Sequence, residues 1–571
     1  MTKEELIEIQ KAERSSCSDA IVNSTATRKV IVAGAGTGKT FTFAQVLRAN
    51  GSTNNLAMTF INMLASDMST TFGDIAEVKT FHAFCKRILH AQNGKVTMIP
   101  YLTKIIEEDA VIAGVDLTDI EGKFQRLEDD GADVKFYLTR GDYYDAVSFN
   151  DSVYRLFRAL QERPDIIPTF EQIVIDEYQD FNPLEVAFIK ELENKGKVLI
   201  VGDDDQSVYS GRNASPDHLR ALVESGDYDG FELPFCSRCT QVIVDATNAF
   251  IRSAVDSGNL KGRIEKRYEC FVDSKDADST KYPVIVTAQC TTGPVVAKYV
   301  NAVIESVSAE EIAESWIEGS EYPTVLIIGP KQYLTAIHKA LGEKYPQMFL
   351  KTSEEIGYSV GEAYKLLLND RASNLGWRIL SGLLLDLKTG KSLVEKTLGG
   401  TPFRNLLDEK FVSDQELILD FIESLQDGVE TDDAKDKEIR AISGEHYDSI
   451  VEEFSPKVAD QNAEPDKTKP SILLTSFVGC KGLSAGHVII VGANNTSLPK
   501  DSGAIDDVEI AQFVVALTRT RKQCHIVSNK WLVAPYMNGQ YQQPFGRSAF
   551  LSWIPDDFKN ERGELKAGDF A

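Results

Sequence analysis

The sequence predicts an α/β protein with two parallel sheets, each interrupted by a mainly helical insertion. Short runs rich in Val and Ile recur along the chain, and helical stretches such as residues 40–49 lie between many of them. Continuous apolar runs of this length suit strands that are buried on both faces of a parallel sheet. Residues 90–165 and 350–468 lack such runs and show helical periodicity instead, which predicts the two insertions.

The apolar runs fall into two groups, and each group predicts one sheet. They comprise residues 30–33, 56–60, 173–175, 198–201, 284–286, 325–328, 472–474, 488–491 and 525–527. The first group ends before about residue 235, and the second begins after about residue 280. Open α/β sheets bind ligands at the carboxyl ends of their strands, so functional residues are expected directly after these runs.

The residues after the first run are typical of a phosphate-binding loop. The segment reads Ala33-Gly34-Ala35-Gly36-Thr37-Gly38-Lys39-Thr40 and lies between an apolar run and a helix. Glycines let backbone N–H groups surround phosphates, and the helix N-terminus adds its positive dipole end. Lys39 would reach the β- and γ-phosphates of ATP, and the Thr40 hydroxyl would bind Mg²⁺. A Gly-rich turn can be purely structural, but Lys39 and Thr40 favour nucleotide binding.

Two adjacent carboxylates, Asp176 and Glu177, follow the third run. Asp176 would hold Mg²⁺ opposite Thr40, and Glu177 would orient and deprotonate the attacking water. Acidic pairs at strand ends are commonly just solvated, but after a phosphate loop the pair is a specific signal. The next strand ends in a similar acidic stretch, in which Gln206 is a candidate sensor of the γ-phosphate.

Composition and charge restrict the function classes. The chain has 571 residues, with Lys+Arg 61 against Asp+Glu 86, and a formal net charge of −25. This excess of acid argues against a simple electrostatic DNA binder. No apolar run reaches the roughly 18–20 residues of a spanning helix, and the first residues do not resemble a signal peptide. The eight scattered cysteines suggest reduced thiols, so a cytoplasmic protein without a membrane partner is expected.

Taken in order, these motifs resemble the UvrD/Rep group of superfamily 1 helicases, which are P-loop NTPases. The segments that carry the resemblance are residues 33–40, 58–62, 79–84, 176–180, 202–209, 237–238, 475 with 481–483, and 515–519. The family has two RecA-like domains that bind ATP between them while single-stranded nucleic acid lies across both. Its accessory domains, 1B and 2B, are inserted where this chain has its strand-poor segments.

The resemblance implies a division into four parts. Residues 1–90 and 165–235 would form RecA-like domain 1A, which binds ATP, and residues 91–164 would form the helical insertion 1B. Residues 236–350 and 469–571 would form RecA-like domain 2A, and residues 351–468 a reduced insertion 2B.

The resemblance also implies roles for individual residues. Arg238 and Arg519 would stabilise charge on the γ-phosphate, and Gln10 would read adenine. The candidates for contact with single-stranded DNA are Phe60, Thr80, Phe81, His82, Tyr209, Arg212 and Thr475. Phe60 and Phe81 could equally be core residues. Departures from the family's pattern weaken ligand contacts: Ser237 stands where the family has an adenine-stacking Tyr, Gly211 removes a base-stacking side chain, and Phe477 and Ser484 replace the usual His and acidic residue of a later motif.

Together these features predict an ATP- and Mg²⁺-dependent translocase or helicase on single-stranded DNA or forked duplex, with 3′→5′ polarity implied by the resemblance. The alternative is a nucleotide-gated regulatory ATPase in a nuclease-containing complex, as in bacterial anti-phage defence, with little unwinding activity. The net charge is compatible with both, because a translocase needs a basic track on only one face.

Overall fold

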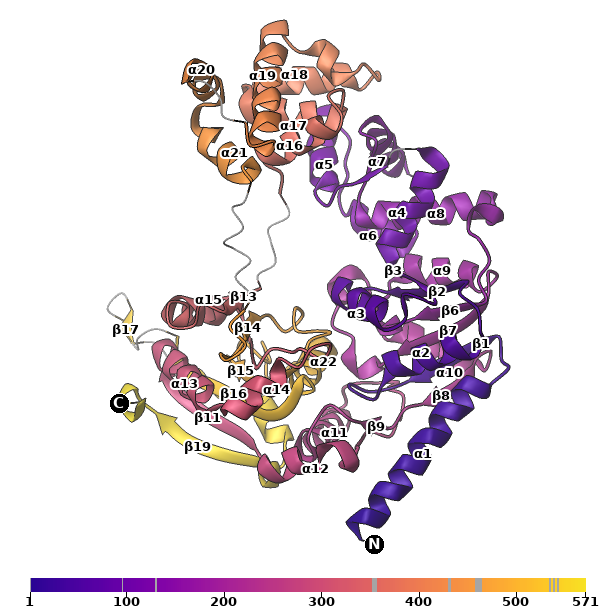
Figure 1. Ribbon diagram of the computed structural model, residues 1–571, viewed down its shortest axis with the longest axis vertical. Coiled ribbons are helices and arrows are strands. Elements are labelled where there is room, and N and C mark those ends of the chain that lie inside the picture. The colour runs from indigo at the N-terminus through magenta and orange to yellow at the C-terminus, as the bar shows by residue number, and fades with distance from the viewer. Residues whose placement is uncertain are drawn as a thin grey trace. The chain divides into compact units, whose positions relative to one another are not determined.

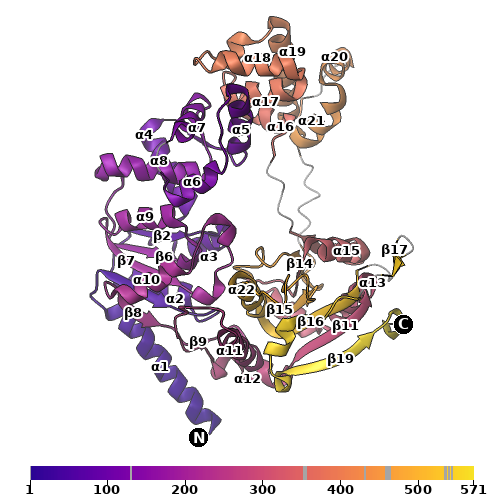
Figure 2. The same cartoon turned by 180° about the vertical axis from the view of Figure 1, so that it is seen from behind.

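The computed structural model describes residues 2–94, 96–128, 131–351, 357–429, 433–456, 465–532, 536–537, 540–541 and 544–570. The chain forms two compact units. The sheet unit comprises Met1–Phe81, Ile167–Ser353 and Pro465–Ala571, and the helical unit comprises His82–Ile166 and Glu354–Glu464. The strands of both large sheets lie within the sheet unit, and most of them are labelled in Figures 1 and 2.

The first large sheet has six strands in the order β3-β2-β6-β7-β1-β8, and all neighbours are parallel. Its strands are β1 (Arg28–Val32), β2 (Asn55–Thr59), β3 (Glu77–Thr80), β6 (Gln172–Ile175), β7 (Lys197–Gly202) and β8 (Asp229–Glu232). Its helices are α1 (Lys3–Asn23), α2 (Lys39–Ala49), α3 (Asn62–Phe72), α9 (Pro183–Leu192) and α10 (Asp217–Ser225). Apolar side chains of α1, α2 and α3 pack against β1, β6 and β7 on one face.

The second large sheet has seven strands in the order β13-β14-β12-β15-β16-β11-β19, and these neighbours are also parallel. Its strands are β11 (Ile285–Thr292), β12 (Val325–Ile328), β13 (Met348–Leu350), β14 (Ile472–Thr475), β15 (Ala485–Val491), β16 (Thr520–Trp531) and β19 (Lys559–Leu565). The helices of this part are α11 (Gln241–Asp256), α12 (Val272–Lys281), α13 (Gly293–Ser306), α14 (Ala309–Ser315), α15 (Lys331–Leu341) and α22 (Asp507–Leu517).

Both faces of the second sheet are covered, as the apolar runs predict. Along β12, Val325 and Ile327 belong to a core cluster with α13 and α15. The alternate residues Leu326 and Ile328 belong to a separate cluster with α11 and α22. Because successive side chains of a strand point to opposite faces, this division requires helices on both sides of the sheet. The predicted fold class, two RecA-like parallel sheets, is confirmed.

Four strands of the two large sheets were not predicted, and they are the four edges of these sheets. Three of them carry polar residues, whereas β13 (Met348–Leu350) is apolar but short. β3 and β8 close the first sheet, and β13 and β19 close the second. Strand β19 is mostly exposed, and β3 is half-buried along its length. An edge strand has a neighbour on one side only, so it is free to carry polar residues that an apolar-run criterion does not detect.

The helical unit contains both insertions. Residues from the first insertion form α4 (Phe81–Asn93), α5 (Leu102–Ala113), α6 (Ile120–Arg126), α7 (Ala132–Tyr143) and α8 (Phe149–Glu162), with short strands β4 (Thr97–Met98) and β5 (Ala146–Val147). Residues from the second form α16 (Val360–Asn369), α17 (Asn374–Leu384), α18 (Leu387–Thr397), α19 (Glu409–Gln426), α20 (Asp433–Ser443) and α21 (Tyr447–Phe454). Among the described residues, no helix combines the length and the apolar character needed to cross a bilayer.

A buried charge cluster joins the two insertions. Asp109 of α5, whose side chain has no exposed surface, accepts hydrogen bonds from Arg140 Nε of α7 at 3.0 Å and from Arg378 Nε of α17 at 2.9 Å. Tyr144 donates its hydroxyl to the same carboxylate at 2.5 Å. The insertions, expected as separate domains, therefore pack against each other within one compact unit.

We expect Asp109→Asn to lower the free energy of unfolding by about 3–5 kcal/mol, because the buried Arg140 loses its ion-pair partner and the buried Arg378 keeps only Glu108 of the described residues, at 3.0 Å. Urea unfolding followed by circular dichroism measures the change. Glu395→Gln, an exposed site on α18 of the same unit, is the matched control and is expected to change the value by less than about 0.5 kcal/mol. Equal midpoints for the two variants would contradict the prediction.

Candidate active site

The phosphate-binding loop connects β1 to α2. Gly36 and Gly38 have φ values of 71° and 95°, in the left-handed region that favours glycine, and Gly38 is the N-cap of α2. Thr37 Oγ1 donates a hydrogen bond to the Gly34 carbonyl at 3.0 Å, and Lys39 Nζ donates to the Ala33 carbonyl at 3.4 Å. The loop therefore turns its backbone around the start of α2, with the Lys39 ammonium beside it, in the arrangement that phosphate binding requires.

A segment leading to the second sheet lies directly against this loop. Ser237 donates its backbone N–H to the Gly36 carbonyl at 3.0 Å, and Tyr268 donates its hydroxyl to the Ala35 carbonyl at 3.0 Å. A Cβ atom placed on Gly36 would lie 2.5 Å from Arg238 Cβ. Arg238 is thus beside the loop, as the sequence predicts. Tyr268 has no motif around it and was not predicted.

The two predicted carboxylates lie at the end of β6. Glu177 has φ of 57°, an uncommon conformation for a residue with a side chain, and its Oε2 accepts a hydrogen bond from Gln179 Nε2 at 2.6 Å. Burial and the neighbouring charge of Glu177 raise the pKa of Asp176 to about 7. Burial would also raise the pKa of Glu177, but Lys481 and Lys39 outweigh it and hold that pKa below its usual range.

Two cations from the second sheet, Lys481 and Arg519, contact residues at the carboxyl edge of the first sheet. Lys481 Nζ lies 3.3 Å from Glu177 Oε2, forms an ion pair with Asp180, and donates to the Gln206 carbonyl at 2.8 Å. Arg519, between α22 and β16, donates from a terminal guanidinium nitrogen to Gln206 Oε1 at 2.9 Å. The structure therefore brings Glu177, Gln206 and Arg519 together. Lys481 belongs to the motif at residues 481–483, but no role was predicted for it.

Gln10 binds the backbone on either side of Phe271. Its Nε2 donates to the Cys270 carbonyl at 3.1 Å, and its Oε1 accepts from the Val272 backbone N–H at 3.0 Å. A cavity of about 260 Å³ lies beside the loop, with Thr37, Phe41 and Phe271 among its lining residues. Gln10 does not line this cavity, and both ends of its amide bind backbone groups. This placement favours a structural role for Gln10 over adenine reading.

Comparisons with known proteins agree with this geometry. A family model described as an AAA domain matches residues 18–212. DNA helicase II of Haemophilus influenzae is 25% identical over 280 residues, which cover 40% of this chain and 38% of the relative. DNA helicase II of Escherichia coli is 26% identical over 301 residues, covering 44% and 40%. The ATP-dependent DNA helicase PcrA of Staphylococcus aureus is 27% identical over 311 residues, covering 44% and 42%.

Over about two fifths of its length the chain is similar to these DNA helicases. It spans about two fifths of the length of the relatives that it matches. The family model covers both the phosphate loop and the end of β7, where Gln206 lies.

Three candidates for nucleic-acid contact lie together at the carboxyl edge of the first sheet. The ring of Phe60, directly after β2, lies 5.8 Å from that of Tyr209. The Arg212 guanidinium lies over Phe60 at 4.1 Å from the ring centroid, and it pairs with Glu185 at 3.4 Å. Thr80 ends the neighbouring strand, β3, and is half-buried. This edge therefore carries a group of two aromatic rings and one guanidinium.

The remaining candidates are not exposed at that edge. Phe81 is fully buried and packs edge-on against Phe188, with ring centroids 5.2 Å apart, which favours the alternative that it is a core residue. Thr475, at the end of β14, is 1% exposed, and its hydroxyl has no hydrogen-bond partner among the described residues. His82 belongs to the helical unit, where its ring lies 5.2 Å from that of Phe149.

We expect Gly36→Ala to destabilise the sheet unit at least twice as much as Gly51→Ala. Both glycines have a positive φ, which costs an alanine about 1–2 kcal/mol, but Gly51 has no atom within 4 Å of an added Cβ. Only the alanine at position 36 would also collide with Arg238. The difference in destabilisation between the two variants therefore measures the contact between the loop and the segment leading to the second sheet. Thermal unfolding of both variants checks this, and equal shifts would contradict it.

Proposed function

We propose that the protein hydrolyses ATP between its two sheets and uses the resulting movement to translocate along single-stranded DNA, with 3′→5′ polarity. The observation that carries the proposal is the hydrogen bond between Gln206 and Arg519, because it joins the two sheets at one buried site. Residues from both sheets around one nucleotide make hydrolysis depend on their closure. The names of the matching relatives, DNA helicase II and PcrA, support DNA as the substrate.

The residues at the end of β6 fit a magnesium ion. Asp176 is 2% exposed, and no Lys or Arg of the described chain forms an ion pair with its carboxylate. A buried carboxylate without a paired cation, together with the Thr40 hydroxyl, offers the oxygen ligands that Mg²⁺ prefers. We propose that Thr40 and Asp176 hold the ion, which when bound neutralises charge on the β- and γ-phosphates.

The remaining site residues have separate roles in hydrolysis. Lys39 and the loop from Gly34 to Gly38 bind the phosphates, and Glu177 orients the attacking water and accepts its proton. Gln206 contacts the γ-phosphate side of the site, and Arg238 and Arg519 stabilise the charge that develops there. The low pKa of Glu177 keeps it ionised at neutral pH, in the form that a base requires.

The regulatory-ATPase alternative differs in its response to DNA. An enzyme that serves as a nucleotide-gated subunit beside a nuclease needs the ATP site but no stimulation by single-stranded DNA. The feature that supports this alternative is Gly211, which places no side chain beside the edge formed by Phe60 and Tyr209. Measurement of the ATPase rate with and without DNA therefore separates the two.

We expect single-stranded DNA to stimulate ATP hydrolysis by the full chain. Glu177→Gln should lower kcat by about 10²–10⁴-fold while ATP still binds, because only the base is lost. Lys39→Ala should lose ATP binding as well. Phosphate release and binding of a fluorescent nucleotide measure both quantities, with Glu395→Gln as the control. Hydrolysis that neither DNA nor RNA stimulates would contradict the translocase and favour the regulatory ATPase.

We expect Phe60→Ala and Arg212→Ala to raise the DNA concentration that gives half-maximal stimulation by about 5- to 100-fold, because each base stacked on an aromatic ring contributes about 1–3 kcal/mol. Phe349→Ala, an aromatic residue 64% exposed on the edge strand β13, is the matched control. The titration is repeated at two salt concentrations, since phosphate contacts weaken with salt. An unchanged titration in both variants would exclude this edge from the DNA-binding surface.

A further inference from the structure

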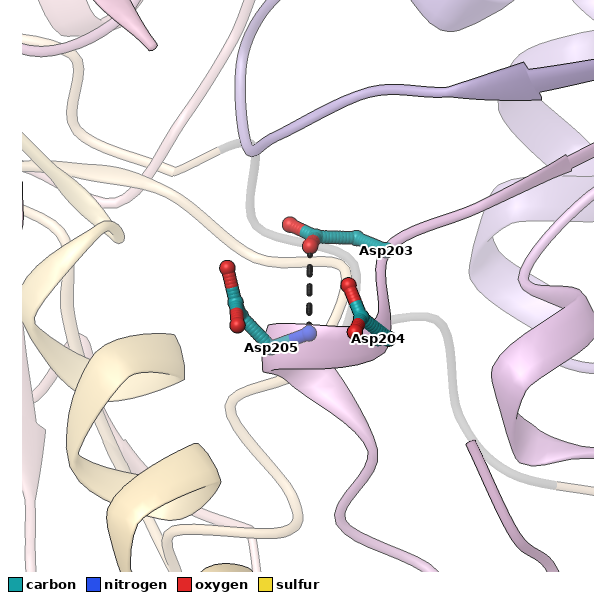
Figure 3. A group of neighbouring side chains, drawn as sticks. All are labelled: Asp203, Asp204 and Asp205. Carbon is teal, nitrogen blue, oxygen red and sulfur yellow. Dashed lines mark hydrogen bonds between the residues drawn. The ribbon is translucent and has the colours of Figure 1, made fainter. Parts of the chain in front are cut away.

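Three consecutive aspartates follow β7 and direct their carboxylates toward a common region. Asp203, Asp204 and Asp205 are each 2–3% exposed, and one oxygen from each lies within 4.8 Å of the others. Figure 3 shows the three side chains and the hydrogen bond from the Asp205 backbone N–H to Asp203 Oδ1, at 3.2 Å. Three carboxylates so close in a buried place repel one another, so the cluster requires a cation.

The cation in this cluster is a lysine ammonium. Lys266 Nζ lies 2.8 Å from Asp203 Oδ1, 2.8 Å from Asp204 Oδ1 and 2.6 Å from Asp205 Oδ2, and its side chain is 5% exposed. Burial alone would lower the pKa of Lys266, but the three carboxylates outweigh it and raise that pKa above its ordinary value. An acidic group with the geometry of a metal site is therefore neutralised by the protein itself.

Two of the aspartates have other cationic partners. Arg263 binds Asp205 with two nitrogens, at 2.7 and 2.9 Å, and Arg220 Nε lies 3.2 Å from Asp204. Asp203 differs, because among the described residues its ion pair is with Lys266. Removal of Lys266 would therefore affect Asp203 most.

Asp203 connects Lys266 to the reaction site. One carboxylate oxygen binds Lys266, and the other accepts a hydrogen bond from Gln206 Nε2 at 2.5 Å. Gln206 uses its opposite amide atom, Oε1, to accept the hydrogen bond from Arg519. The amide can satisfy both partners in one orientation only, since rotation by 180° would place its NH₂ against the guanidinium. The position of the Asp203 carboxylate thus determines which way the Gln206 amide faces.

We propose that Lys266 is a positioning residue for ATP hydrolysis, which holds Asp203 and, through it, the amide of Gln206 in the orientation that receives Arg519. The proposal rests on the proposed function, since it assigns Lys266 to the same ATPase site. Lys266 lies between α11 and β10 (Glu269–Cys270), outside the motifs that carry the family resemblance. Its effect on the rate is indirect, because it contacts Asp203 rather than Gln206.

The test compares Lys266→Met with Arg263→Met in the full chain. Both variants remove one cation from the cluster, but only the first removes the partner of Asp203. We expect Lys266→Met to lower kcat for ATP hydrolysis by about 10- to 100-fold with KM within about two-fold of the wild type, because small displacements of catalytic groups have effects of this size. Arg263→Met should lower the melting temperature to a similar extent and leave kcat within about two-fold.

Asp203→Asn provides a second route to the same result. It should reproduce the loss of kcat, and the double variant Lys266→Met/Asp203→Asn should be no slower than either single variant, because both act on one interaction. The proposal would be overturned if the loss of kcat in the double variant equals the product of the two single losses. Equal losses of kcat in Lys266→Met and Arg263→Met would also overturn it. If Lys266→Met does not fold, an unchanged kcat in Asp203→Asn overturns it equally. A wild type without ATPase activity would instead refute the proposed function.

Discussion

Lys481, from the second sheet, places its ammonium among Glu177, Asp180 and the backbone carbonyl of Gln206, all at the carboxyl edge of the first sheet. Burial would lower the pKa of this ammonium, yet the two carboxylates raise it above its ordinary value. A buried carboxylate pair without a cation is strongly unfavourable, and here the cation comes from the other sheet. The electrostatics of the candidate base therefore depend on the packing of one sheet against the other. A hydrolysis site built in this way is sensitive to separation of the sheets, which is the property that a nucleotide-driven motor requires.

The burial of each strand explains whether it was predictable from the sequence. Central strands such as β1 and β12 are buried on both faces, so their sequences must be continuously apolar and are recognisable without a structure. Edge strands such as β3 and β19 carry no such constraint. The phosphate loop and the Asp176-Glu177 pair were predictable because their positions directly after strands restrict both backbone and chemistry. The packing of the two insertions was not, since it depends on Asp109 meeting Arg378, 269 positions further along the chain.

Within the site, residues that belong to a local pattern were found, and residues that act from a distance were missed. Tyr268 and Lys266 reach the loop and the acidic cluster from a segment without a motif, so no spacing rule identifies them. For Phe81 the sequence left both a DNA contact and a core position open, and in the structure this ring is buried against Phe188. A motif specifies residue type and order, but an aromatic side chain at a strand end can face the core or a ligand, and packing decides between them.

The net charge illustrates how far composition can mislead. A value of −25 suggests an acidic exterior, yet many of the carboxylates near the candidate site are buried and most of these have partners within the protein. Asp180 is paired with Lys481, and Asp203 to Asp205 surround Lys266. In the helical unit, Asp109 likewise binds two arginines. A buried charge of this kind contributes to the sum but little to the field that an approaching polymer meets, because its partner lies within a few ångströms. For the proposed contact with DNA, the relevant charge is that of the edge around Phe60 and Arg212, where the guanidinium lies over the aromatic ring and pairs with Glu185. Local composition at that edge, rather than the total, determines whether a strand of phosphates is attracted to it.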